Sequence, residues 1–444
     1  MDSSFTAGIF MGVAVIVLLM AGMPIAFSLG LVAIAAIIIF LEPSQFQLFA
    51  NFTYQSLDNF SLLAIPLFVL MGAIFANSRA GTGLFNAAQK WLGRLPGGLA
   101  ISSVAASALF AALCGSSAAT AAAIGKVAIP EMQKRNFPNA IATGAVVAGG
   151  TLGILIPPSV TLILYGIATE QSIGQLFMGG IVPGLILTFM FCLWIFIATV
   201  MERKGIISLG SGEAMPEVTS YSWGTRMKAF FQVLPFVILL VAILGALYGG
   251  FATPGEAAAV GAIFALIMVL VTYRSMTWKK FMNILLESTK ESTMILLIIA
   301  FSAVIGTVMS FLSIPQDLAN LIAGLEMSKW WILFFINIFL MILGCFLLPV
   351  AIILMTAPIL YPIITTLGFD PIWFGVIMSI NMEMGLITPP VGLNLFVVKG
   401  IAPKIPTSDI LKGSVPYIVV IAVAIVIFSI FPNIITWLPY KLMG

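Results

Sequence analysis

The chain has 444 residues, of which 61% are hydrophobic and 8% are charged, with a formal net charge of +3 and a mean hydropathy of +1.17. This composition excludes an ordinary soluble domain and predicts an all-α polytopic membrane protein. The chain has no histidine, and its three cysteines lie in apolar segments, so neither imidazole relays nor disulfide or thiolate metal sites are supported. The basic residues lie in short connections, and the net charge does not indicate a nucleic-acid partner.

Apolar runs of membrane-spanning length predict about ten transmembrane helices. In chain order they are residues 5–21, 25–41, 60–78, 138–165, 177–201, 231–248, 255–272, 293–312, 372–398 and 414–438. Two more apolar segments, 97–127 and 330–364, are long but interrupted in the middle. Each could be one crossing or a re-entrant hairpin that turns inside the membrane.

The positions of Lys and Arg predict which connections face the cytoplasm. Basic residues lie on both sides of 97–127, so this segment should be a hairpin that enters from the cytoplasm. Segment 330–364 is flanked mainly by acidic residues and should be a hairpin that enters from outside. The polar stretch 202–229 is predicted to be a cytoplasmic linker, and 42–59 and 166–176 to be external connections. Both termini should then lie outside.

The two halves of the chain match one another in order. Pro157-Pro158 aligns with Pro389-Pro390 at a shift of 232 (389 − 157), and Cys114 aligns with Cys345 at a shift of 231 (345 − 114). Further aligned pairs are Pro24 with Pro254, Pro130 with Pro362, and Val182-Pro183 with Val415-Pro416. With five spans in each half, an odd number, the second copy must be inverted in the membrane. We therefore expect one inverted repeat over 1–201 and another over 230–444.

Each Pro-Pro pair should break a membrane helix, at 138–165 and at 372–398. Proline removes backbone donors and leaves carbonyl groups free, which is tolerated at membrane depth only where protein, ions or water satisfy them. Free carbonyls suit Na⁺, and helix N-termini suit a carboxylate. Polar side chains beside the breaks are Thr151, Ser159, Thr161, Thr388 and Asn394. The alternative is that each Pro-Pro only kinks a packed helix whose hydroxyl groups bond to their own turn.

Two other features carry candidate chemistry. The turn Gly115-Ser116-Ser117 allows close backbone approach and offers hydroxyl groups, although small residues there could also serve helix packing. Its counterpart around Leu348 is apolar. Glu383 is a carboxylate at membrane depth just before the second break, and it is either functional or a protonated structural group.

Strings along the whole chain resemble the large membrane subunit of tripartite ATP-independent periplasmic (TRAP) transporters, the DctM-like family. The similar strings are IPLFVLMG at 65–72, LPGGLA at 95–100, the tip at 115–117, LIPPS at 155–159, GIVPG at 180–184, TPGEAAA at 253–259 and LITPPVGLNLF at 386–396.

The resemblance implies Na⁺-coupled uptake of an organic acid across the bacterial inner membrane by an elevator mechanism, with transport and scaffold domains. It implies a small four-helix membrane partner (Q-type) and a periplasmic substrate-binding protein (P-type), and neither an organic cofactor nor an enzyme activity. The first implied Na⁺ site comprises Gly115, Ser116, Ser117, Thr151, Gly153 and Pro157. The second comprises Cys345, Leu348, Thr356, Glu383, Met384, Gly385 and Thr388. Implied substrate ligands are Ser116, Ser117, Ser159, Thr388 and Asn394.

One departure bears on the substrate, which the resemblance implies to be an acid of the sialic acid or C4-dicarboxylate class. Many members of the family carry an acidic residue near the turn that Leu348-Pro349 forms here, and this chain does not. The departure favours a bulkier acid such as sialic acid. A passive channel for small anions is the main alternative, because broken helices also line selectivity filters. An intramembrane enzyme would need a convergent acid/base constellation, for which the spans offer little.

Overall fold

The computed structural model describes residues 3–41, 45–204, 221–274, 276–324 and 327–443, and every regular element in these ranges is a helix. The first half contains α1 (Ser3–Met20), α2 (Ile25–Phe40), α3 (Phe46–Leu57), α4 (Ala64–Ala76), α5 (Ala80–Leu92), α6 (Gly98–Cys114), α7 (Ser117–Gln133), α8 (Asn139–Thr151), α9 (Val160–Thr169) and α10 (Ile173–Arg203). The second half contains α11 (Trp223–Tyr248), α12 (Pro254–Met268), α13 (Trp278–Phe311), α14 (Ile314–Ala323), α15 (Lys329–Phe346), α16 (Pro349–Thr366), α17 (Pro371–Leu386), α18 (Leu393–Ile401), α19 (Thr407–Ile430) and α20 (Asn433–Met443). Short turns η2 (Phe60–Leu63), η3 (Leu152–Ile154) and η4 (Val269–Tyr273) extend α4, α8 and α12.

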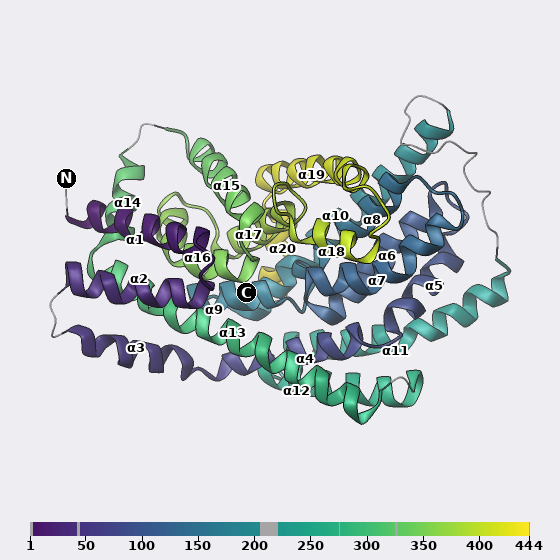
Figure 1. The fold of residues 1–444 in the computed structure, drawn as a ribbon, viewed down its shortest axis with the longest axis horizontal. Coiled ribbons are helices and arrows are strands. Elements are labelled where there is room, and N and C mark those ends of the chain that lie inside the picture. Colours follow the sequence, from purple (N-terminus) through teal and green to yellow (C-terminus); the bar gives the residue numbers. More distant parts are fainter. Residues whose placement is uncertain (1–2, 42–44, 205–220, 275, 325–326, 444) are drawn as a thin grey trace.

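The helices form two packed groups (Figure 1). One group is a layer in which α2 and α3 pack on α13, α4 packs on α12 and α13, and α11 packs on α12. The other group contains the hairpin α6–α7 packed on α8 and η3, and the hairpin α15–α16 beside α17. In the same group α9 packs on α16, α18 packs on α7, and α19 packs on both α8 and α17. We call the first group the layer and the second the core group.

Within the described ranges, seven helices are long and apolar enough to cross a membrane, and the bent pair α3–α4, with an angle of 60° at its break, could add an eighth. They are α10, α11, α12 with η4, α13, α15, α16 and α19. Fewer pass this test than the ten spans predicted, because α1 and α2 count as shorter apolar helices and α4 passes only within the bent pair. In addition, 138–165 divides into the short helices α8 and α9, and 372–398 into α17 and α18. Conversely, α15 and α16 are each long and apolar enough to count as spans, although 330–364 was predicted to be one hairpin. Length and composition alone do not separate a membrane span from a hairpin arm.

Several boundaries differ from the sequence prediction. Helix α13 has 34 residues and begins 15 residues before the predicted start at 293 (293 − 278). The connection predicted at 42–59 contains the helix α3, and α5 and α14 are short helices outside the predicted spans. The span predicted at 414–438 is wrong in its bounds, because α19 ends at Ile430 and α20 begins at Asn433. Most of the predicted linker 202–229 lies outside the described residues, and its last part already belongs to α11.

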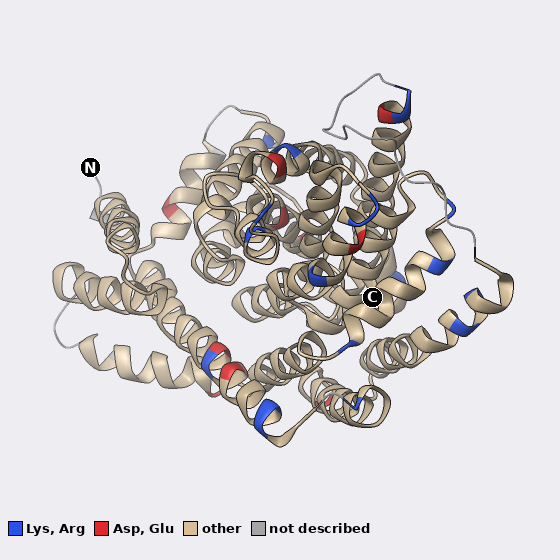
Figure 2. Ribbon diagram, turned by 45° about the vertical axis from the view of Figure 1, so that its right-hand side comes forward, with Lys and Arg blue, Asp and Glu red and all other residues tan. Residues whose placement is uncertain are grey.

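Charged and large apolar side chains are distributed along the helices as expected for a membrane protein. Long stretches of the ribbon carry no charge, and many charged residues lie near helix ends and in connections (Figure 2). Glu287, Lys290 and Glu291 are an exception inside α13. At the start of α12, the Thr253 hydroxyl accepts a hydrogen bond from the Glu256 backbone N–H, and the Glu256 carboxylate accepts one from the Thr253 N–H, which together form a capping box. On α15, Phe334 and Phe335 are about half exposed, as expected for a face that meets lipid.

Candidate functional site

The first hairpin turns at Gly115 and rests on the first helix break. Gly115 has φ +62°, and a Cβ at this position would lie 2.9 Å from the Pro158 carbonyl oxygen. Ser116 is extended, and a Cβ at Gly153 would lie 2.6 Å from the Ser116 carbonyl oxygen. Glycine at both positions therefore lets the backbone of the turn touch the backbone of the break.

Within the first break, the carbonyl oxygens that lose helical partners are satisfied by nearby hydroxyl groups. The Pro157-Pro158 peptide bond is cis, and α9 restarts at Val160. The Ile154 carbonyl accepts hydrogen bonds from Ser159 Oγ at 2.5 Å and Thr161 Oγ1 at 2.8 Å. Ser159, predicted as a substrate ligand, is fully buried and points to this carbonyl.

The second break repeats this geometry against the second hairpin. The Pro389-Pro390 bond is also cis, and α18 restarts at Leu393. The Gly392 N–H donates to the Cys345 carbonyl at 3.4 Å, which ties the break to the end of α15. A Cβ at Gly385 would lie 2.6 Å from Gly344 Cα, so these two helices also meet at backbone contact.

Three predicted threonine ligands bond to their own helices. Thr151 Oγ1 donates to the Ala148 carbonyl, Thr356 Oγ1 to Ile352 and Thr388 Oγ1 to Met384, at 2.7, 2.7 and 2.6 Å. This is the behaviour that the packed-helix alternative expects of a hydroxyl. A hydroxyl oxygen that donates its hydrogen in this way still has lone pairs with which it can bind a cation.

The second broken helix is joined directly to the first hairpin. Asn394 Nδ2 donates to Ser117 Oγ at 2.8 Å and to the Val147 carbonyl at 3.2 Å, and Ser117 Oγ approaches Asn394 Oδ1 at 3.1 Å. Both side chains are buried, and α18 lies beside α7 in Figure 1. Two residues predicted separately as substrate ligands are thus hydrogen-bond partners.

The hairpin turns and breaks meet at one cavity of 370 Å³ between the core group and the layer. From the core group, it is lined by Cys114, Gly115, Ser116, Ser117, Ala118, Ala119, Ile154, Val160, Thr161, Leu348, Pro349, Val350, Leu386 and Leu393. From the layer, it is lined by Val69, Gly72, Ala73, Ala76, Asn77, Glu287, Ser288, Glu291, Met294, Ile295 and Ile298. No Lys or Arg is among these residues of the described chain.

Of the predicted site residues, Gly115, Ser116, Ser117 and Leu348 line this cavity. The others do not line it and lie in the hairpin arms, the broken helices or the breaks: Thr151, Gly153, Pro157, Ser159, Cys345, Thr356, Glu383, Met384, Gly385, Thr388 and Asn394.

Glu383 lies in the interior of the core group. Its side chain is fully buried, and neither carboxylate oxygen has a hydrogen-bond partner among the described residues. The nearby Asn381 amide donates to the Asn337 backbone carbonyl at 2.9 Å and to its side-chain oxygen at 2.8 Å. An unpaired buried carboxylate is costly, so Glu383 must be neutral or must face a cation.

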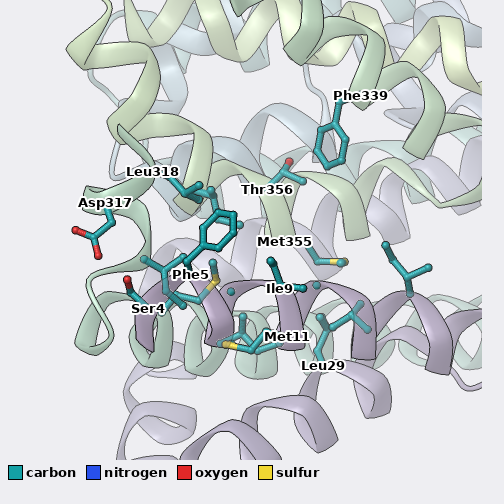
Figure 3. Close-up of a pocket in the computed structure, with 18 of the residues that line it drawn as sticks. Ser4, Phe5, Ile9, Met11, Leu29, Asp317, Leu318, Phe339, Met355 and Thr356 are labelled. Atoms are coloured by element: carbon teal, nitrogen blue, oxygen red, sulfur yellow. The ribbon is translucent and has the colours of Figure 1, made fainter. Parts of the chain in front are cut away.

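A larger cavity of 800 Å³ lies between α1, α2, α13, α14, α15 and α16, away from the hairpin turns (Figure 3). Its walls are apolar, with Ser4 and Asp317 at one edge. Thr356, a predicted ligand of the second Na⁺ site, lines this cavity while its hydroxyl bonds to its own helix.

Comparison with known proteins identifies the family. The model of the DctM component of tripartite ATP-independent periplasmic transporters matches residues 12–434. The chain belongs to this family. The C4-dicarboxylate TRAP transporter large permease protein DctM of Pseudomonas aeruginosa is 40% identical over 413 residues, which are 93% of each chain. The sialic acid TRAP transporter large permease protein SiaM of Vibrio cholerae serotype O1 is 32% identical over 96% of this chain and 97% of that one.

Two further comparisons extend this result. The 2,3-diketo-L-gulonate TRAP transporter large permease protein YiaN of Escherichia coli K12 is 32% identical, over 95% of this chain and 96% of its own. The crystal structure of the YdaH transporter of Alcanivorax borkumensis has a TM-score of 0.61 with 14% identity and 90% coverage of both chains, which shows a shared fold. The chain is thus a multi-pass membrane protein of the TRAP large permease family.

In this TRAP permease, the part of the 370 Å³ cavity lining that α4 and α13 contribute was not predicted from the sequence. Glu287, Ser288 and Glu291 share one face of α13, since helical residues three and four apart are neighbours. Polar residues at that spacing in a long apolar helix are the signal that could have identified this wall. The predicted start at 293 left these residues outside the helix.

Proposed function

We propose that this chain is the membrane subunit through which a Na⁺ gradient drives uptake of an organic acid across the bacterial inner membrane. The substrate belongs to the sialic acid or C4-dicarboxylate class, for which the relatives described above are named. The observation that carries the proposal is the meeting of both hairpin turns and both helix breaks at one cavity without Lys or Arg in its described lining.

Helix N-termini supply the electrostatics for an anion. Four helices begin at the cavity, and their first turns contribute Ser117 of α7, Val160 of α9, Pro349 of α16 and Leu393 of α18. Each N-terminus carries about half a positive charge together with free backbone N–H groups. Four such ends can hold a carboxylate in place of a cationic side chain.

Helix C-termini supply the complementary ligands for Na⁺. The last residues of α6 and α17, Cys114 and Leu386, line the same cavity. Ile154 of η3 lines it too, but its carbonyl already accepts hydrogen bonds from Ser159 and Thr161. No group of three or more His, Cys, Asp or Glu side chains that could hold a metal occurs in the described ranges. Carbonyl and hydroxyl oxygens would therefore hold Na⁺, a hard cation that prefers oxygen ligands.

We place two Na⁺ sites, one at each contact between a hairpin and a break. The first uses Gly115, Ser116, Ser117, Thr151, Gly153 and Pro157, and the close approach of Gly153 to the Ser116 carbonyl supports it. The second uses Cys345, Leu348, Thr356, Glu383, Met384, Gly385 and Thr388, and there a cation would satisfy the unpaired Glu383 carboxylate.

The two halves act as inverted repeats in this proposal, and the core group moves as an elevator against the layer. The cavity supports this motion because it lies between the two groups. A small four-helix membrane subunit would complete the fixed part, and a periplasmic binding protein would deliver the substrate.

The test is uptake of labelled acids into proteoliposomes that contain both membrane subunits, with loaded binding protein outside. We expect accumulation above the external concentration when Na⁺ is high outside, and its loss when K⁺ replaces Na⁺. Equilibration without accumulation, at any Na⁺ gradient, would indicate a passive channel for small anions and refute the proposal.

A further inference from the structure

The layer presents a polar patch of α13 to the cavity. Glu287, Ser288 and Glu291 line the cavity, and one to two turns further along the same face Ile295 and Ile298 line it with apolar side chains. The polar patch and the apolar part of the wall therefore face the same space, opposite the Ser116 and Ser117 turn.

The oxygen atoms of this patch are not fully occupied by hydrogen bonds or ion pairs among the described residues. Ser288 is 5% exposed, and its Oγ has no hydrogen-bond partner among the described residues. Glu287 pairs with Lys290 at 3.2 Å, but its own side chain remains 72% exposed. Glu291 forms no ion pair within the described ranges.

The patch lies toward the end of α13 that the sequence predicts to be cytoplasmic. Helix α13 begins at Trp278, with Lys279 and Lys280 in its first turn. Glu291 is 13 residues from that end (291 − 278), which is roughly 20 Å along the helix axis. A cation that leaves the hairpin turns for the cytoplasm would pass this wall.

We propose that Glu287, Ser288 and Glu291 form a cation site on the fixed layer, which receives Na⁺ as it leaves the hairpin turns for the cytoplasm. Two carboxylates and a free hydroxyl are suitable oxygen ligands for a hard monovalent cation. The same negative charges repel an anionic substrate and so separate it from the departing ion. The inference rests on the Na⁺ coupling proposed above.

The experiment varies Na⁺ on one face at a time. Proteoliposomes contain both membrane subunits, and substrate-loaded binding protein outside selects the molecules whose periplasmic face is outward. Uptake is measured with fixed external Na⁺ and increasing internal Na⁺, which inhibits by rebinding. In the double variant Glu287→Gln/Glu291→Gln, we expect the internal Na⁺ concentration for half-inhibition to rise roughly 3- to 10-fold, as loss of nearby charge implies. The external requirement should change less than about twofold.

Two further variants serve as controls, one with the opposite expected effect and one with no expected effect. Lys290→Gln removes the cation that pairs with Glu287 and should lower the internal half-inhibition concentration. Glu131→Gln alters a carboxylate paired with Arg135 outside the cavity and should change nothing. Equal internal Na⁺ sensitivity in the wild type and the double variant overturns the inference but leaves Na⁺ coupling intact. A wild type without any Na⁺ response overturns both.

Discussion

The pair Ser117–Asn394 joins the two halves of the chain, and its removal has a measurable cost. Asn394→Ala deletes the two amide donor contacts, to Ser117 Oγ and the Val147 carbonyl, and leaves Ser117 Oγ buried with fewer partners. Side-chain hydrogen bonds inside membrane proteins contribute about 0.6 kcal/mol on average and up to about 1.7 kcal/mol. Two such bonds plus the small void left by the amide give roughly 2–3 kcal/mol of lost unfolding free energy.

A double-mutant cycle separates the interaction energy of Ser117 with Asn394 from the cost of the void that the substitution leaves. The variants are Ser117→Ala, Asn394→Ala and both together, and the measurement is the unfolding free energy in mixed micelles. Because Ser117 and Asn394 approach at two atom pairs, 2.8 and 3.1 Å, we expect a coupling energy of about 1–1.5 kcal/mol. A control cycle of Ser117→Ala with Asn381→Ala should be additive, since Asn381 bonds to Asn337 instead. A Ser117–Asn394 coupling below about 0.3 kcal/mol would refute the assignment.

Three further predictions test the site. Ser116→Ala or Thr388→Ala should raise the Na⁺ concentration for half-maximal uptake about 3- to 10-fold, because each removes one oxygen ligand, and expression should not fall. Unchanged Na⁺ dependence in both variants would show that these residues are not Na⁺ ligands. Gly72→Ala would place a Cβ against the Cys114 carbonyl oxygen and should reduce uptake about tenfold or more. The control Gly245→Ala has open space around its new Cβ and should retain uptake. Equal activity of the two variants would contradict the close approach of Gly72 to Cys114. Glu383→Gln should weaken Na⁺-dependent thermal stabilisation, because the unpaired carboxylate loses its charge, and stabilisation equal to wild type would favour a neutral structural acid.

The sequence located the features that depend on backbone chemistry. Two proline pairs and a Gly-Ser-Ser turn constrain the chain wherever they stand, so the breaks before Val160 and Leu393 and the turn at Gly115 could be predicted closely. These signals are local, and burial does not override them.

Features that depend on tertiary contacts could not be predicted in this way. Helix α3 and the first four turns of α13 are rich in polar residues, so a search for apolar runs left them out although both are helical. The contact between Ser117 and Asn394 joins residues 277 positions apart, and no local pattern encodes it. Ser159 was predicted to face substrate, but the carbonyl that its hydroxyl meets at Ile154 becomes available only when the break folds back.

The arrangement of helix ends offers a physical basis for ion coupling without a charged ligand pair. Residues at the first turns of α7 and α16 and at the last turns of α6 and α17 line one cavity, so helix ends of both signs of partial charge meet there. A cation at the carbonyl ends raises the local potential felt by an anion at the amide ends, and an anion does the reverse for the cation. Thermodynamic linkage makes these effects equal, so Na⁺ and the acid each strengthen the binding of the other by one coupling free energy. Substitutions that move the Gly115 turn away from Pro158 should then weaken both ligands by similar factors, whereas loss of a single ligand atom should mainly weaken one.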